Sequence, residues 1–291
     1  MKRVLITGAN SYIGLSFERY IQENYPSDYE IDTVDMIDGT WREKSFSGYD
    51  SVFHVAGIAH SDDKKIGAEE AQAYYKINTD LAIETAKKAK ADGVKQFVFM
   101  SSSIVYGHGS KMGKEKRITN DTLPAPANCY GDSKLQAENG ITPLGDETFK
   151  VVILRPPMIY GKDCKGNYPK LSAYAKKFSF FPKVENERSM LYVENLTEFV
   201  RLMIENEESG LFFPQNAEYG NTSKLVKTIA TANGKKIRLV KGFGWCLKLL
   251  GLFTGIVDKA FGSLTYDFSM SEYKQDYRIK TLLQSIEETE K

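Results

Sequence analysis

Short apolar runs alternate with segments of helical spacing over the first half of the sequence, and this alternation limits the possible folds more than any other feature. Runs that are apolar throughout are typical of strands buried on both faces of a parallel sheet. The predicted strands are Arg3–Thr7, Glu30–Asp35, Ser51–Ala56, Gln96–Met100 and Lys150–Leu154, and the predicted helices are Ile13–Asn24, Ala68–Ala91 and Tyr130–Asn139. We therefore predict the α/β class, with a doubly wound parallel sheet of the Rossmann type.

A glycine-containing turn follows the first predicted strand, in the sequence Thr7-Gly8-Ala9-Asn10-Ser11-Tyr12-Ile13-Gly14. Glycine at this turn lets the backbone approach a ligand, and the N-terminus of the next helix presents N–H groups to a pyrophosphate. The fingerprint for such turns has three glycines, and here Ser11 occupies the middle position. We predict a dinucleotide-binding turn rather than an ordinary strand-to-helix turn. Its cofactor-binding residues are Gly8, Asn10, Ser11, Tyr12, Ile13 and Gly14.

Asp35 ends the second predicted strand about twenty residues beyond Gly14, where an acid hydrogen-bonds the adenosine ribose. The same carboxylate would repel a 2′-phosphate, and the two residues after it add no positive charge. NAD is therefore favoured over NADP as the cofactor, although Arg42 and Lys44 lie close enough in sequence to leave NADP open. The alternatives to Asp35 in this role are Asp32 and Asp38.

Tyr130 and Lys134 lie four residues apart in a predicted helix, which places them on one face, one turn apart. An ammonium near a phenol favours the phenolate, so we expect the pKa of Tyr130 to fall below its reference value of about 10. Such a tyrosine can exchange a proton with a substrate hydroxyl or carbonyl near neutral pH. The pair is common by chance, and its meaning depends on the motifs around it.

The alternation of strands and helices ends after Arg155-Pro156-Pro157, where loops lengthen and aromatic residues cluster. Helices are still predicted at Val193–Asn206 and Ser223–Ala232. We expect a dinucleotide-binding Rossmann domain over residues 1–156, to which about 187–215 return, and a smaller C-terminal substrate-binding lobe made of 157–186 and 216–291.

Composition limits the classes of function. The formal net charge of +1 gives no reason to expect a polyanion-binding surface, so we predict no nucleic-acid partner. The cysteines, Cys129, Cys164 and Cys246, have no metal-ligand spacing, which favours a reducing cytoplasm and no metal site. The apolar segment 243–264 contains three charges and four glycines. We expect it to pack in the lobe or line a cleft rather than insert stably in a membrane, with a membrane-surface segment as the alternative.

The motifs together resemble those of an extended short-chain dehydrogenase/reductase of the NAD-dependent epimerase/dehydratase family. They occur in the family's order over roughly residues 1–200. Besides Thr7–Gly14 and the YxxxK pair Tyr130–Lys134, they are His54-Val55-Ala56-Gly57 (HxAG), Asn78–Ala82 (NxxGT, with Leu81 and Ala82 replacing Gly and Thr), Phe97–Gly107, Leu154–Gly161 (LRPxxxYG) and Arg188–Val193.

The resemblance implies the following roles. Ser102, placed by its distance from Val105-Tyr106-Gly107, would hydrogen-bond the reacting sugar oxygen while Tyr130 moves the proton, and Ser103 is the alternative serine and a substrate contact. Lys134 would bind the nicotinamide ribose, and the nicotinamide would carry the hydride. Further cofactor contacts implied by the family motifs are Ala56, Gly57, Asn78 and Pro157.

Three residues are candidates for binding the rest of the substrate. Arg188 matches the arginine that grips a nucleotide-sugar diphosphate, because a guanidinium binds such oxygens bidentately; a surface arginine is the alternative. Asn167 is predicted either to contact the nucleotide sugar or to cap a helix starting near Pro169. His60 is a candidate to face the sugar, with a structural or solvent-exposed histidine as the alternative.

The residues after Ser102 also bear on the reaction. Family members that remove water carry an Asp-Glu pair there, whereas this chain has Ser103-Ile104, so a dehydratase is disfavoured. We predict a cytoplasmic, homodimeric NAD(P)-dependent 4-epimerase or 4-ketoreductase of a UDP-hexose or UDP-N-acetylhexosamine, similar to enzymes of bacterial surface-polysaccharide synthesis. The alternatives are a reductase of a non-sugar ketone or alcohol and a non-catalytic dinucleotide-sensing protein.

Overall fold

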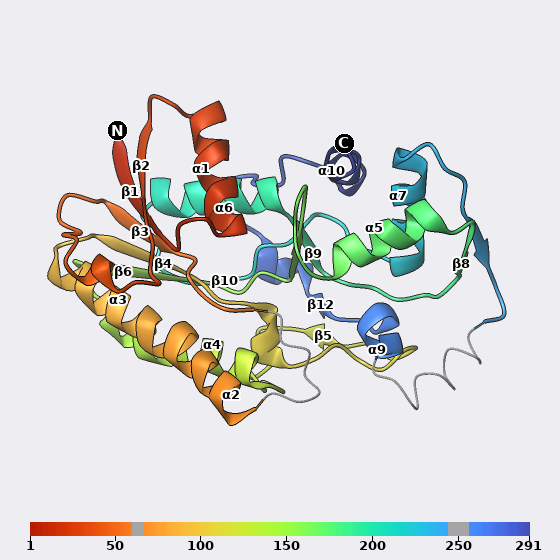
Figure 1. Cartoon of the computed structure of the whole chain (residues 1–291), viewed down its shortest axis with the longest axis horizontal. Coiled ribbons are helices and arrows are strands. Elements are labelled where there is room, and N and C mark those ends of the chain that lie inside the picture. Colours follow the sequence, from red (N-terminus) through yellow and green to blue (C-terminus); the bar gives the residue numbers. More distant parts are fainter. Residues whose placement is uncertain (60–66, 244–255) are drawn as a thin grey trace. The chain divides into compact units, whose positions relative to one another are not determined.

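The computed structural model describes residues 1–59, 67–243 and 256–291 of the chain (Figure 1). The chain divides into two compact units. The first comprises Met1–Gly107, Pro124–Pro156 and Leu196–Pro214, and the second comprises His108–Leu123, Pro157–Asn195 and Gln215–Lys291.

A six-stranded parallel sheet forms the centre of the first unit, with the order β10-β6-β4-β3-β1-β2. Its strands are β1 (Lys2–Thr7), β2 (Tyr29–Val34), β3 (Ser51–His54), β4 (Gln96–Met100), β6 (Lys150–Leu154) and β10 (Gly210–Phe212). The strand order reverses at β1, and in open sheets of this kind ligands bind beyond the carboxyl ends of the strands at such a point. The prediction of a doubly wound parallel sheet is confirmed.

Helices cover both faces of this sheet (Figure 1). Helices α1 (Tyr12–Asn24) and α6 (Val193–Glu205) lie on one face, and α2 (Ala68–Tyr74), α3 (Leu81–Ala91) and α4 (Cys129–Ile141) lie on the other. Small side chains of α3 and α4, including Ala86 and Ala137, belong to the same buried cluster as Phe97 and Phe99 of β4. Close approach of these helices to the strand therefore depends on alanine at the contact. Short helical turns are η1 (Thr40–Arg42), η3 (Ser103–Tyr106) and η4 (Thr142–Leu144).

The helix predicted over 68–91 is not regular throughout, because a π-helical stretch, η2 (Tyr75–Asp80), separates α2 from α3. Asn78 and Thr79 are buried in this stretch. The Asn78 amide donates to the Ile58 carbonyl (3.0 Å) and to the Ser133 hydroxyl (3.1 Å). The Thr79 hydroxyl donates to the Ser133 carbonyl (2.7 Å). The prediction of one uninterrupted helix was wrong here, since the wider turn aims two polar side chains at α4 and apolar spacing does not reveal it.

Among its described residues, the second unit contains three two-stranded parallel sheets and several helices. The strand pairs are β5 (Arg117–Ile118) with β12 (Thr265–Tyr266), β7 (Met158–Tyr160) with β9 (Met190–Tyr192), and β8 (Phe180–Pro182) with β11 (Arg238–Val240). The helices are α5 (Asn167–Lys177), α7 (Thr222–Ala232), α9 (Ile256–Phe261), α10 (Leu282–Thr289) and the turn η5 (Phe268–Ser271). Tyr160 joins several of them, because its ring stacks on Tyr168 and its hydroxyl lies 2.5 Å from that of Ser285.

Within the described ranges, no helix combines the length and the apolar character needed to cross a membrane. Most of the apolar segment 243–264 (residues 244–255) lies outside the described residues. Its described part includes α9, where Val257 and Phe261 are buried and the Phe261 ring lies 5.7 Å from that of Phe181. In the part of the chain that the structure covers, no group of three side chains is arranged to hold a metal ion.

Candidate active site

The glycine turn after β1 has a backbone that requires glycine at its first position. Gly8 has a φ of +104°, and a Cβ added there would lie 2.8 Å from the backbone nitrogen of Ala56. The turn of β1 and the end of β3 are therefore in direct backbone contact. Ser11, which stands where the fingerprint has glycine, is the N-cap of α1, and its hydroxyl accepts a hydrogen bond from the Gly14 N–H (3.1 Å). The serine that replaces the fingerprint glycine therefore caps the N-terminus of α1.

Asp35 is the first residue after β2 and is exposed at the carboxyl end of that strand. Its carboxylate accepts a hydrogen bond only from a near neighbour in the described structure, the Ile37 N–H (2.8 Å). Both alternative acids are engaged elsewhere: Asp32 accepts from the Tyr49 hydroxyl (2.6 Å), and Asp38 accepts from Thr40. Asp35 is therefore the acid at the sheet edge where a ribose is expected.

Arg42, which together with Lys44 left NADP open in the sequence, makes a close ion pair with Glu84. Its Nε lies 2.5 Å from a Glu84 carboxylate oxygen, and a second bond joins its terminal nitrogen to the other oxygen (2.6 Å). Because this bidentate pair already balances the guanidinium charge, Arg42 is a poor partner for a 2′-phosphate.

The catalytic serine and tyrosine predicted from the sequence come together in the first unit. Ser102 follows the end of β4 and is the N-cap of η3, where its hydroxyl accepts from the Ile104 N–H (3.3 Å). Tyr130 lies in the first turn of α4, where the neighbouring Ser102 side chain acts to lower the pKa of its phenol. Ser103 lies in η3, with its N–H donated to the Pro156 carbonyl (2.9 Å).

Lys134 is buried and contacts the strand rather than the tyrosine. Its ammonium donates to the Met100 carbonyl (2.8 Å) and lies 4.7 Å from the centre of the Phe99 ring. Burial lowers the pKa of Lys134 to about 8, against the opposing effect of the Glu138 charge. A Cβ added at Gly57 would lie 2.9 Å from Asn78 Oδ1 and 3.3 Å from Lys134 Nζ. Three of the predicted cofactor contacts therefore lie together.

The prediction that Lys134 lowers the pKa of Tyr130 below its reference value was wrong. Burial raises the pKa of Tyr130, and the Ser102 side chain opposes that rise. Helical spacing does place Tyr130 and Lys134 on one face, but the ammonium is directed to the Met100 carbonyl. Loss of hydration of the phenolate therefore decides the direction of the shift.

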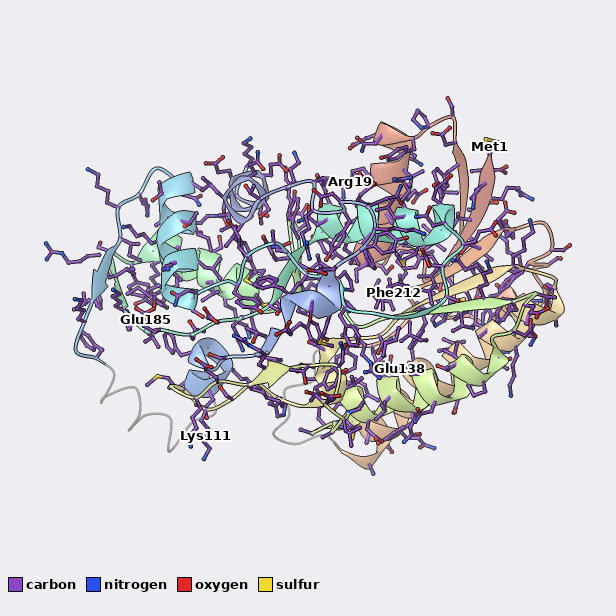
Figure 2. The ribbon with its side chains drawn as sticks, turned by 180° about the vertical axis from the view of Figure 1, so that it is seen from behind. Met1, Arg19, Lys111, Glu138, Glu185 and Phe212 are labelled. Carbon is purple, nitrogen blue, oxygen red and sulfur yellow. The ribbon has the colours of Figure 1, made fainter. Side chains whose placement is uncertain are left out.

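A buried charged network lies beside this pair and was not predicted. Glu138, which is labelled in Figure 2, lies on α4 one turn after Lys134. Its carboxylate accepts bonds from the Arg155 guanidinium (3.0 and 3.1 Å from Nε) and from the Ser101 hydroxyl. Arg155 also donates to the Tyr106 hydroxyl (2.7 Å). Glu138 and Arg155 are 4% and 6% exposed. The spacing of Lys134 and Glu138 was the available signal, because it repeats the four-residue step of the tyrosine and lysine.

His54, at the end of β3, is a fully buried structural histidine. Its Nδ1 lies 2.7 Å from the Thr7 hydroxyl, and its ring stacks on Phe97 and Phe99. Burial, reinforced by the charge of Lys134, lowers the pKa of His54 to about 3, so the imidazole is neutral near pH 7. His60, the histidine predicted to face the sugar, lies outside the described residues.

Arg188, Asn167 and Pro157 belong to the second unit. Arg188 is partly exposed, its guanidinium donates to the Lys259 carbonyl (2.7 Å), and burial lowers its pKa. Asn167 is exposed and is the first residue of α5, whose N-cap is Gly166. The alternative in which Asn167 caps a helix near Pro169 was therefore wrong, since the helix begins earlier and the cap makes no side-chain hydrogen bond.

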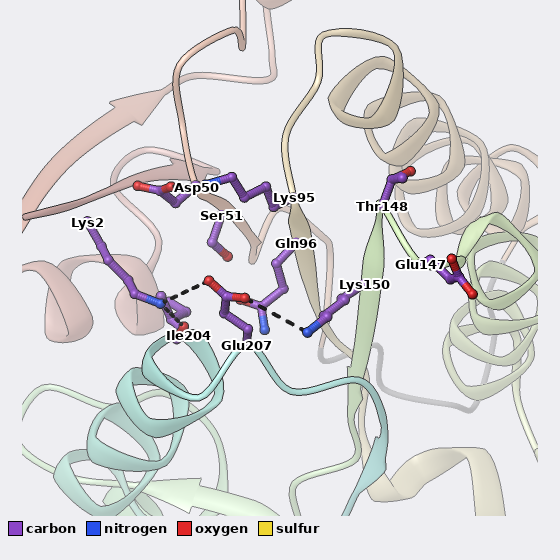
Figure 3. Close-up of a pocket in the computed structure, with 10 residues that line it drawn as sticks. All are labelled: Lys2, Asp50, Ser51, Lys95, Gln96, Glu147, Thr148, Lys150, Ile204 and Glu207. Carbon is purple, nitrogen blue, oxygen red and sulfur yellow. Dashed lines mark hydrogen bonds and ion pairs between the residues drawn. The ribbon is translucent and has the colours of Figure 1, made fainter.

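A cavity of about 310 Å³ lies at the opposite end of the strands (Figure 3). It is lined near the amino ends of the strands by residues such as Lys2, Ser51 and Lys150. Glu207 pairs with both lysines, at 3.6 and 3.8 Å. The three lysines that line the cavity are matched by three acids, Asp50, Glu147 and Glu207. Because the lining charges balance, and because ligands of open α/β sheets bind at the carboxyl edge, the cavity is not the candidate active site.

The sheet order, the glycine turn and the Ser-Tyr-Lys set are those of a Rossmann-fold short-chain dehydrogenase/reductase. The sequence model of the "NAD dependent epimerase/dehydratase family" matches residues 4–212, and the chain belongs to this family. The resemblance stated from the motifs is thus confirmed, as is the prediction of an NAD(P)-dependent enzyme of this type.

Two curated relatives match over most of their length. The UDP-glucose 4-epimerase of Vibrio cholerae is 30% identical over 92% of this chain and 88% of its own. The N-acetyl-alpha-D-glucosaminyl-diphospho-ditrans,octacis-undecaprenol 4-epimerase of Escherichia coli O157:H7 is 26% identical over 87% of this chain and 81% of its own. Among solved structures, the UDP-glucuronic acid 4-epimerase of Bacillus cereus, in complex with NAD, has a TM-score of 0.72 at 18% identity, over 98% of this chain and 96% of that one, which shows a shared fold.

Proposed function

We propose that this protein is an NAD-dependent 4-epimerase or 4-ketoreductase of a UDP-hexose or UDP-N-acetylhexosamine. The observation that carries the proposal is the approach of Ser102, after the carboxyl end of β4, to Tyr130, close enough for the serine to lower the pKa of the phenol. Two neighbouring hydroxyls can share one substrate oxygen, which is what proton transfer at a carbinol or ketone requires. Both curated relatives are named as sugar 4-epimerases, in agreement with this reaction.

The residues at the sheet edge fit a nicotinamide dinucleotide. The glycine turn and the start of α1 would hold the pyrophosphate, and Asp35 would accept from the adenosine ribose. Lys134 and Asn78, together beside Gly57, would contact the nicotinamide ribose. When bound, NAD supplies the acceptor and donor of hydride. We propose NAD rather than NADP because Asp35 is exposed at the strand end while Arg42 is paired with Glu84.

Tyr130 and Ser102 would act on the sugar oxygen in both directions of the reaction. During oxidation, Tyr130 accepts the proton of the C4 hydroxyl, and during reduction it returns a proton to the ketone oxygen. Ser102 hydrogen-bonds the same oxygen. The raised pKa of Tyr130 favours the phenol, which is the state needed to reduce a ketone, whereas the oxidation step requires the phenolate. Both epimerases and ketoreductases include the reduction step.

Elimination of water is a poorer fit to this chain. The positions after Ser102 are Ser103 and Ile104 at the start of η3, and neither can act as an acid or a base near neutral pH. An epimerase or ketoreductase needs no second acid–base pair beside the ring.

We further propose Arg188 as the partner of the substrate diphosphate, with Asn167 as a nucleotide-sugar contact. By analogy with the family, we also propose that the protein is a cytoplasmic homodimer.

The experiment that tests the reaction is purification of the protein followed by measurement of bound cofactor and of turnover. An epimerase is expected to retain NAD and to interconvert UDP-glucose with UDP-galactose, or the N-acetylated pair, without added cofactor. A ketoreductase is expected to consume added NADH with a UDP-4-keto sugar. If the folded protein binds NAD but catalyses neither reaction, the proposal is contradicted.

A reductase of a non-sugar ketone is the second enzymatic possibility, and Arg188→Ala separates it from the proposed function. Loss of the guanidinium should raise KM for the UDP-linked substrate about tenfold or more, because charged hydrogen bonds to the diphosphate are lost. Unchanged kinetics with a nucleotide sugar, together with turnover of a simple hydroxy-ketone, would favour the non-sugar reductase.

A further inference from the structure

One surface of the second unit has a strongly uneven charge. Strands β8 and β11 pair in parallel, with Phe180 opposite Arg238, and bring residues 176–183 and 234–243 side by side. These two segments contain no Asp or Glu. Their basic residues are Lys176, Lys177, Lys183, Lys235, Lys236, Arg238 and Lys241. We call this the β8–β11 surface; the net charge of +1 for the whole chain conceals it.

The basic side chains of the β8–β11 surface are exposed. Within the described ranges, two of them are paired with acids: Lys176 with Glu290 (2.8 Å) and Lys183 with Glu185 (3.7 Å; Glu185 is labelled in Figure 2). Lys235 donates to the Lys176 carbonyl. Most of the positive charge therefore remains directed to solvent and is available to an anionic partner.

Exposed phenylalanines accompany this charge. Phe178, Phe180 and Phe243 are 41%, 51% and 42% exposed, and they are three of the four exposed phenylalanines among the described residues. The pleat of β8 explains the arrangement, because Phe181 points inward, with its ring 5.1 Å from that of Tyr174, while Phe180 points outward. Exposed aromatic rings among basic residues, positioned by the β8–β11 strand pair, indicate an interaction site rather than a charged surface that only contacts water.

We propose that the β8–β11 surface docks on an anionic lipid bilayer. Four to eight clustered basic residues are the usual number for recognition of acidic headgroups, and apolar rings among them enter the interface. Such docking needs no spanning helix. A nucleic acid is the rival polyanion, and the exposed phenylalanines favour the bilayer, because its interface takes up apolar rings.

The test is co-sedimentation of the full-length protein with vesicles. Vesicles of phosphatidylcholine with phosphatidylglycerol should bind the protein, vesicles of phosphatidylcholine alone should not, and added salt should release it because exposed charges are screened. Failure to bind the anionic vesicles at low salt would overturn the proposal. Two soluble competitors, a duplex DNA oligonucleotide and the phosphatidylglycerol headgroup, are then compared. If the DNA releases the protein from the vesicles at a lower concentration than the headgroup does, the nucleic acid is favoured instead.

Matched variants assign the binding to this surface. The triple variant Lys236→Gln, Arg238→Gln and Lys241→Gln should lower the partition coefficient by more than about tenfold, since each basic residue contributes about fivefold. A control of equal charge, Lys87→Gln, Lys95→Gln and Lys114→Gln, removes exposed lysines elsewhere and should retain most of the binding. Equal losses in the two triple variants would show that net charge, not this surface, governs binding.

The aromatic contribution is tested separately. Phe180→Ser should weaken binding several-fold even at low salt, whereas Leu123→Ser, at a residue 82% exposed elsewhere in the unit, should have little effect. Thermal unfolding and turnover of a water-soluble nucleotide sugar should be unchanged in all four variants, because the altered side chains are exposed and none belongs to the candidate active site. No difference between Phe180→Ser and the parent would exclude insertion of the ring.

Discussion

The Lys134 ammonium donates a 2.8 Å hydrogen bond to the carbonyl of Met100, the last residue of β4. The same face of α4 makes two further contacts with this strand end: Tyr130 with Ser102, and Glu138 with Ser101. Three residues spaced by four along α4 therefore contact three consecutive residues, Met100 to Ser102, at the end of β4 and just after it. This pairing of helix and strand therefore brings Ser102 and Tyr130 together.

Replacement of Tyr130 by Phe should lower turnover by about 10²–10⁴-fold, because the proton-transfer group is lost while the ring remains. Binding of NAD, followed by fluorescence titration, should change little. Thermal unfolding of the variant serves as the control for folding. Retention of full turnover would show that Tyr130 is not the proton donor and acceptor.

Replacement of Glu138 by Gln should lower the free energy of unfolding by about 3–5 kcal/mol, because the buried Arg155 guanidinium loses its charged partner. The measurement is urea unfolding followed by circular dichroism. The double variant Glu138→Gln, Arg155→Met should recover part of the loss, since it leaves no unpaired charge in the core. A double variant less stable than either single variant would contradict this account.

Protonation of His54 should make the protein less stable as the pH falls. Its pKa is about 3 when folded, below the reference value of 6.5, so only the unfolded chain gains a proton between these values. The contribution to stability is complete above pH 6.5 and is lost progressively towards pH 3. Between about pH 7 and about pH 5 the loss should be about 2 kcal/mol.

His54→Leu provides the comparison for that measurement. Whatever its stability at neutral pH, this variant should lack the part of the acid dependence that belongs to the imidazole. Urea unfolding at the two pH values, for parent and variant, isolates the difference. Parallel pH dependences for the two proteins would mean that other groups cause the acid sensitivity.

Asp35→Asn should weaken NAD binding by about ten- to one-hundred-fold, because a charged hydrogen bond to the ribose is replaced by a neutral one. The preference for NAD over NADP should fall as well, since the repulsion of a 2′-phosphate disappears. Calorimetric titration with both cofactors measures the two effects. Asp38→Asn is the matched control, because that carboxylate accepts from Thr40; an equal effect of the control would remove Asp35 from the proposed role.

Local sequence patterns were sufficient for the sheet and for the residues at its edge. Continuous apolar runs predicted the five longest strands of the sheet, and the turn at Gly8, the acid at Asp35 and the Tyr130–Lys134 spacing all follow from short-range geometry. Such patterns depend on neighbours within a few residues, so they are visible in one dimension. The wider turn at Asn78 and the network of Glu138 with Arg155 were not visible, because each satisfies polar groups that come from distant parts of the chain.

The sequence alone therefore determined the fold class, the family and the chemical types at the candidate site. Only the tertiary structure decided how those groups behave. Burial raised the pKa of Tyr130 where helical spacing had suggested the opposite, and the Met100 carbonyl took the Lys134 ammonium. The tertiary structure also brought together the basic residues of two separate segments, which form the β8–β11 surface of a nearly neutral chain. Desolvation and charge clustering depend on which segments meet in space, and spacing along the chain does not encode that.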